Sequence, residues 1–150
     1  MSEARRPVTD ADLRRFTGYG MKRAFNAIQA DLNGALAPHG IRMLTYSALS
    51  VTGENPGISA AALAGALSME RSNMVGIVDE LVRAGWIDRA RAQGDRRSYA
   101  LRLTDAGRAA LASATIAVEA HEARMVQGLS GPDRAALRRA FALIEGRMPR

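Results

Sequence analysis

The stretch from residue 59 to residue 104 constrains the fold of this chain more than any other. Two segments with helical spacing of apolar residues follow one another across a four-residue break. The first begins at Ser59, a residue type favoured at helix N-caps. Its apolar face consists of Ala62, Leu63 and Ala66. The apolar face of the second, which begins near residue 69, consists of Met74, Ile77, Val78 and Leu81. This spacing predicts two short helices that pack on a common core.

An extended hairpin is predicted directly after the second helix. Gly85 supplies the left-handed conformation that ends a helix, and residues 86–89 begin a strand. Residues 90–97 hold three arginines and a Gly-Asp turn signal. Tyr99, Leu101 and Leu103 then alternate with smaller or polar residues, as expected of a half-buried strand. Two helices followed by such a hairpin indicate a winged helix-turn-helix, and arginines at the hairpin tip suit phosphates or a narrow minor groove.

These residues resemble the MarR-type winged-helix transcription regulators of bacteria. The resemblance extends over most of the chain and rests on Leu63-Ala64, Leu67, Arg71-Ser72-Asn73-Met74-Val75, Asp79, Leu81, Gly85, Arg89, Asp95-Arg96-Arg97, Leu103-Thr104 and Gly107-Arg108. The resemblance implies that Asp95 orients Arg97 and that Arg97 enters the minor groove. The chain departs from the family at Val75-Gly76, where Thr-Arg is common, because Gly76 has no side chain to offer a base.

The second helix is expected to lie in the major groove of double-stranded DNA. Asn73 can make a bidentate contact to adenine, Ser72 can reach a base or a phosphate, and Val75 could touch a thymine methyl group. The full set of expected DNA contacts is Ser59, Arg71, Ser72, Asn73, Val75, Arg89, Arg91, Asp95, Arg96 and Arg97.

Long helices are predicted at both ends of the chain. We expect a single domain over residues 1–150, mainly α-helical with a small β-hairpin wing: the winged region covers about 43–104, and dimerisation helices cover about 10–37 and 105–148. The last helix is predicted to start at a Ser130-x-x-Asp133 cap. The apolar stripes of the terminal helices exceed what a small winged region can cover, so we expect a homodimer that binds a pseudo-palindromic operator.

The resemblance also implies a small-molecule effector, bound where the first, second and fifth helices of the family meet. The positions that correspond here are Phe16, Tyr19, Arg42, Met43 and Tyr46. An arginine beside aromatic and thioether side chains suits an aromatic acid or its coenzyme A thioester. For Phe16, Met43 and Tyr46 the alternative is an ordinary packing role, and Arg42, where the family often has Ser or Thr, could simply cap or pair.

Other functions are less consistent with the composition. The chain has no cysteine and two histidines, His39 and His121, which we interpret as packing or capping residues; a ligand role for His121 stays open. We therefore expect no metal site, no cofactor and no enzyme activity. A formal net charge of +6 suits nucleic acid, and the lack of a long apolar run or signal sequence predicts a cytoplasmic protein without a membrane partner. A ligand-responsive repressor is the leading hypothesis, and a non-specific nucleoid-type DNA-binding protein is the alternative.

Overall fold

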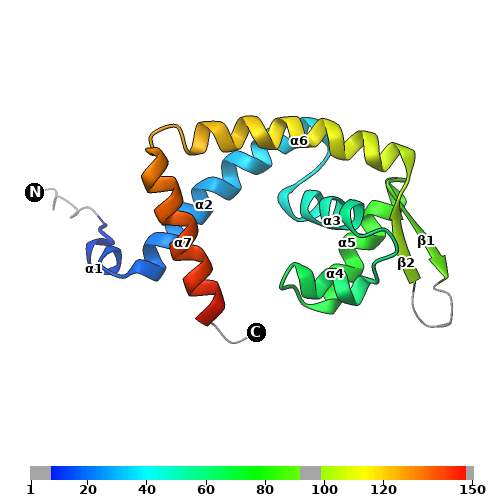
Figure 1. The fold of residues 1–150 in the computed structure, drawn as a ribbon, viewed down its shortest axis with the longest axis horizontal. Coiled ribbons are helices and arrows are strands. Elements are labelled where there is room, and N and C mark those ends of the chain that lie inside the picture. The colour runs from blue at the N-terminus through cyan, green and yellow to red at the C-terminus, as the bar shows by residue number, and fades with distance from the viewer. Residues whose placement is uncertain (1–7, 92–98, 148–150) are drawn as a thin grey trace, which may run out of the picture.

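The computed structural model describes residues 8–91 and 99–147 (Figure 1). Within these ranges the elements follow in the order α1 (Ala11–Arg14), α2 (Thr17–Leu36), a 3-10 helix η1 (Ala37–His39), α3 (Met43–Glu54), α4 (Ala60–Ala66), α5 (Arg71–Arg83), β1 (Ile87–Arg91), β2 (Tyr99–Leu103), α6 (Asp105–Met125) and α7 (Gly131–Arg147). The mainly helical fold with one antiparallel hairpin that the sequence predicts is confirmed.

The elements divide into two groups in space. Helices α3, α4 and α5 gather with the hairpin at one end, and we call residues 43–104 the winged unit (Figure 1). Helix α1, the start of α2 and helix α7 lie at the other end, and α6 runs between the two ends. We call α1, α2, α6 and α7 the terminal frame.

The core of the chain lies mainly in the winged unit. All four apolar residues predicted for the inner face of α5 are buried there, together with Leu49 of α3, Leu63 of α4, Ile87 of β1 and Leu101 of β2. The start of α4 is fixed by the Ser59 hydroxyl, which accepts a hydrogen bond of 3.1 Å from the Ala62 amide, as its residue type predicts. Gly85 has a φ of 74°, so the predicted helix end is also confirmed.

The base of the hairpin is fixed to the start of α6. The Thr104 amide donates to the Trp86 carbonyl at 3.0 Å, and the Thr104 hydroxyl caps α6 by accepting from the Gly107 amide at 2.9 Å. A Cβ atom on Gly107 would lie 2.0 Å from the Trp86 carbonyl oxygen. This contact allows no side chain at residue 107, which gives a physical reason for glycine there.

The first predicted helix is interrupted. Instead of one helix from Asp10 to Ala37, the chain forms α1 and α2 with Phe16 between them in an extended conformation (φ −95°, ψ 126°). Thr17, Gly18 and Gly20 follow the break, and threonine and glycine have low helix propensity. The helical spacing of apolar residues therefore continues across Phe16, although the backbone is not helical there.

Helix α7 is capped as predicted but scarcely covered. The Asp133 amide donates to the Ser130 hydroxyl, and the Ser130 amide donates to the Asp133 carboxylate, both at 3.2 Å. None of the α7 residues whose burial is described is buried, and Leu137, Phe141, Leu143 and Ile144 are exposed. No helix in residues 8–91 or 99–147 is long and apolar enough to cross a membrane.

Candidate nucleic-acid interface

The outer face of α5 is open at its N-terminal end. Arg71, Ser72 and Asn73 are exposed there, and Val75 is exposed next to them. The opposite face of the same helix is held in the core by Met74 and its apolar neighbours. The amphipathic pattern that buries one side of α5 therefore presents the polar side, as expected for a helix that docks in a major groove.

A surface hollow of about 740 Å³ lies beside this face. It is lined by the start of α4, the outer face of α5 and both strands. Five of the predicted contact residues line it together: Ser59, Arg71, Ser72, Val75 and Arg89. Asn73 is exposed on α5 but is not part of that lining. The hollow thus brings together predicted residues from three separate segments.

Two of these residues also have partners within the chain. Arg89 of β1 forms an ion pair with Asp79 of α5, which ties the hairpin to the helix. The Ser59 hydroxyl is engaged as the cap of α4. Both residues therefore have structural roles, and contact with DNA would be a second role for each.

The wing tip stays a prediction. Asp95, Arg96 and Arg97 lie outside the described residues, as does the side chain of Arg91, whose backbone ends β1. The expectation that Asp95 orients Arg97 therefore rests on the sequence resemblance.

Tyr99 is a candidate contact that the sequence pattern did not identify. The alternation in β2 placed it inside, but its side chain is 52% exposed and lines the same hollow. Leu101, two residues along the same face, is buried. Tyr99 pairs with Arg91, the last pair before the connecting residues of the hairpin, whereas Leu101 lies nearer its base. Where along a strand the core ends is not revealed by a two-residue period.

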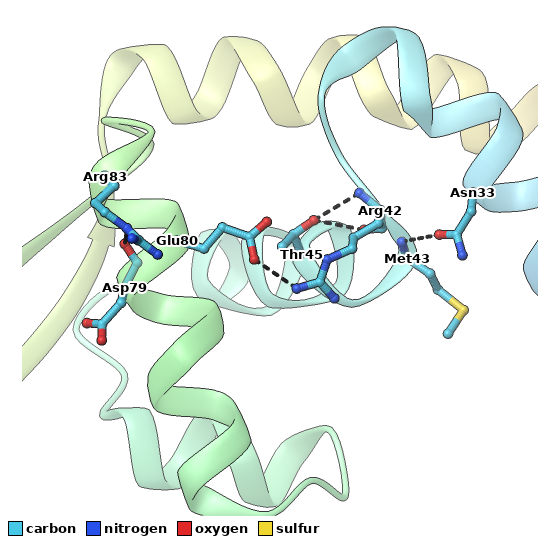
Figure 2. A network of polar contacts seen from close by, with 7 residues as sticks. All are labelled: Asn33, Arg42, Met43, Thr45, Asp79, Glu80 and Arg83. Atoms are coloured by element: carbon cyan, nitrogen blue, oxygen red, sulfur yellow. Dashed lines mark hydrogen bonds and ion pairs between the residues drawn. The ribbon is translucent and has the colours of Figure 1, made fainter.

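The residues predicted to bind the effector fall into two groups. Arg42 and Met43 lie at the start of α3 (Figure 2), and Tyr46 follows in its first turn. The Arg42 guanidinium donates to the Glu80 carboxylate of α5 at 2.8 Å, and the Met43 amide donates to Asn33 of α2 at 2.8 Å. The Tyr46 and Thr115 hydroxyl groups form a hydrogen bond of 3.2 Å that joins α3 to α6.

Phe16 and Tyr19 form the second group, at the opposite end of α2. Phe16 is 54% exposed, and the Tyr19 hydroxyl donates to Asp10 at 2.7 Å. That bond, and after it the one from Arg14, lowers the pKa of Asp10. The same bond to Asp10 raises the pKa of Tyr19. The 20 residues of α2 separate the two groups by about 30 Å along the helix. Within one chain the five residues do not form one pocket.

Both histidines have partners that account for their positions. His39 lies at the end of η1, and its Nδ1 atom is 3.0 Å from the Ser113 hydroxyl. His121 is buried on α6 and donates to Asp31 of α2 at 2.6 Å, while Arg124 reaches the same carboxylate oxygen at 3.1 Å. These bonds, the one from His121 first, lower the pKa of Asp31. In the described part of the chain no three His, Cys, Asp or Glu side chains are grouped to hold a metal ion.

Known proteins resemble the chain in sequence. Residues 39–98 match the model of the MarR family. A putative transcriptional regulatory protein for the hcr operon of Thauera aromatica is 38% identical over 92 residues, which are 61% of this chain and 55% of that protein. The match therefore spans about half the length of that relative.

Solved structures match over nearly the whole chain. The transcriptional repressor CouR bound to a 23-mer DNA duplex is 34% identical over 93% of this chain and 99% of its own, with a TM-score of 0.87. CouR bound to p-coumaroyl-CoA is 31% identical over 95% and 100% of the two chains, also with a TM-score of 0.87. The MarR family protein Rv2887 of Mycobacterium tuberculosis in complex with salicylic acid is 27% identical over 86% and 96%, with a TM-score of 0.68.

Proposed function

This chain belongs to the MarR family of DNA-binding transcription regulators, and from that premise we propose that it is a homodimeric repressor released from its operator by an organic acid or its coenzyme A thioester. The observation that carries the proposal is the exposed N-terminal face of α5 beside a hollow lined by Arg71, Ser72 and Arg89. Cationic and hydroxyl groups around an exposed helix start suit the phosphates and base edges of a duplex.

The proposed dimer is supported by the uncovered apolar side chains of the terminal frame. In and beside its helices these side chains are Leu13, Phe16, Phe25, Ile116, Met125, Leu129, Leu137, Phe141 and Ile144; Leu143 is also exposed, on another side of α7. Burial of apolar surface contributes about 25 cal/mol per Å². A second copy of the frame offers a matching apolar surface, and two-fold symmetry suits the equivalent half-sites of a palindromic operator.

The proposed effector site is supported by the ligands of the similar structures. CouR is solved with p-coumaroyl-CoA and Rv2887 with salicylic acid, both of which join an aromatic ring to an acid-derived group. In this chain Arg42 would hold the negative group, with Met43 and Tyr46 against the ring. Phe16 and Tyr19 would join that pocket only if the second copy supplies them, because within one chain they lie at the other end of α2.

Selection of binding sites from a pool of random duplexes tests the DNA-binding proposal. We expect a palindromic sequence bound about 10³-fold or more tightly than random DNA. Asn73→Ala should relax preference at one symmetric position of each half-site, whereas Arg71→Ala should weaken all sequences nearly equally and reduce the salt dependence by about one counterion. A ratio near one would favour the non-specific nucleoid-type protein instead.

A further inference from the structure

The Arg42 side chain links the corner between α2 and α3 to the proposed recognition helix. It meets Glu80 of α5 at 2.8 Å, and about half of each side chain is exposed, 46% for Arg42 and 44% for Glu80 (Figure 2). The two residues are 38 positions apart in the sequence. The pair is therefore a tertiary contact between the corner that joins α2 to α3 and the helix that presents Arg71, Ser72 and Asn73.

The backbone of this corner is firmly held. The Met43 amide donates to the Asn33 side chain of α2 at 2.8 Å, and the Arg42 amide donates to the Thr45 hydroxyl at 3.0 Å (Figure 2). The first bond fixes the start of α3 relative to α2, and the second holds the first turn of α3. The Arg42 side chain thus extends from this fixed corner to α5.

The same turn of α5 is tied to the hairpin on its other side. Asp79 pairs with Arg89 of β1, while the next residue, Glu80, pairs with Arg42. Two consecutive carboxylates thus hold α5 between the wing and the corner. Arg71 lies nine residues nearer the N-terminus, about 13 Å along the helix axis, so a change of tilt at Glu80 displaces the DNA-facing end.

We propose that Glu80 is a positioning residue that sets the tilt of α5 through Arg42, and that the effector's acidic group acts by taking Arg42 from Glu80. The second half rests on the proposed function. An exposed ion pair shifts the equilibrium between two tilts of α5 by at most about fivefold. A ligand carboxylate or phosphate that binds Arg42 can overcome a shift of that size. The Arg42 guanidinium can pair with Glu80 or with the acidic group of the effector. Effector binding therefore disfavours the tilt of α5 that fits the operator, and operator binding disfavours the effector to the same degree.

A ligand-free experiment tests the positioning role. The intact protein binds the duplex selected by the wild type, and two further duplexes whose half-sites are one base pair closer or farther apart. In Glu80→Gln, the ratio of affinity for the selected duplex to affinity for the two altered duplexes should fall about fivefold. The charge-matched control Glu54→Gln removes an exposed carboxylate of α3 with no ion pair among the described residues, and should keep the preference.

The charge swap Arg42→Glu with Glu80→Arg should restore the spacing preference, since ratios between duplexes cancel uniform electrostatic changes. Circular dichroism melting of each variant checks that folding is retained. An unchanged preference in Glu80→Gln, or a swap that fails to restore it, overturns the proposal.

A second experiment tests the exchange with p-coumaroyl-CoA and salicylate as probes. For a probe that releases the wild type, Glu80→Gln should require up to about fivefold less of it, because the competing carboxylate is gone. An equal requirement overturns the exchange. If neither probe releases the wild type while the spacing result holds, the effector class in the proposed function is wrong and the positioning role of Glu80 stands. If the wild type prefers no duplex, both proposals fail.

Discussion

The winged unit buries its apolar residues, whereas the terminal frame leaves many of its own exposed. In the winged unit, α5 buries its whole inner face and the hairpin buries Ile87 and Leu101. In the frame, α1 buries no residue, and α7 has no buried position among those described. Both groups have capped helices, so the contrast is one of packing and not of local helix signals. Within a single chain the apolar residues of the winged unit are thus buried, and many of those in the terminal frame stay exposed for contact with a second copy.

The largest effect is expected from a charge on the open face of α7. Phe141→Glu places a carboxylate on the stripe formed with Leu137 and Ile144, and should convert the dimer to a monomer. Loss of the linked second half-site should weaken operator binding by about 100-fold or more. Sedimentation velocity and DNA titration measure the two effects.

Leu143→Glu is the control for that variant, since Leu143 is also apolar and exposed, 58% against 46% for Phe141, but lies off the stripe. The contrast fails if the wild type already sediments as a monomer at micromolar concentration, or if both variants dissociate equally.

A substitution at the base of the hairpin should damage the winged unit instead. Gly107→Ala places a methyl group against the Trp86 carbonyl oxygen, 2.0 Å away, so the start of α6 must shift. We expect a loss of about 1–3 kcal/mol in the free energy of unfolding, measured by thermal or urea denaturation. Gly65→Ala in α4, where a Cβ atom meets nothing within 4 Å, should leave stability equal or slightly higher. Equal losses in the two variants would contradict the close contact.

Acid should loosen the frame at the α2–α6 contact. The folded-state pKa of Asp31 is lowered by His121 and then Arg124, so its stabilising contribution is present above the ordinary aspartate pKa and is lost as pH falls through the lowered value. The melting temperature of the wild type should exceed that of Asp31→Asn at neutral pH, and the gap should close below about pH 4. A gap that stays constant down to pH 2 would show that the charge is not what matters.

The smallest effect is expected at Tyr99. If its exposed ring lies against the DNA backbone, Tyr99→Phe should weaken binding severalfold by removing a neutral hydrogen bond, without altering the salt dependence. Tyr99→Ala should lose more, because the ring surface goes as well. Wild-type affinity in both variants would place Tyr99 outside the interface.

Local signals in the sequence were sufficient for most of the winged unit. Ser59 and Ser130 cap the helices that they were expected to cap, and the three-four spacing in α5 matches the residues that are buried. These features depend on neighbours within a turn or two of helix.

What the sequence could not reveal depends on distant parts of the chain. The sequence left open whether Arg42 binds the effector, caps a helix or forms a pair, and it could not show that the partner is Glu80 in another helix. The exposure of Tyr99 depends on where the core ends, which periodicity does not report. The break at Phe16 was missed because the apolar spacing continues across residues of low helix propensity. Phe16 and Tyr19 could not be joined to Arg42 because one chain keeps them at opposite ends of α2.

Helix α6 extends without interruption from the hairpin to the end of the molecule where α7 begins (Figure 1). Its first turn is fixed on Trp86 through Thr104 and Gly107. Its 21 residues span about 32 Å. A rigid rod of that length converts a rotation of five degrees at one end into a movement of about 3 Å at the other, close to the rise of one base pair. Substitutions far from DNA, on the frame end of α6, would therefore be a route by which relatives acquire new operator spacings while every base-reading side chain stays the same.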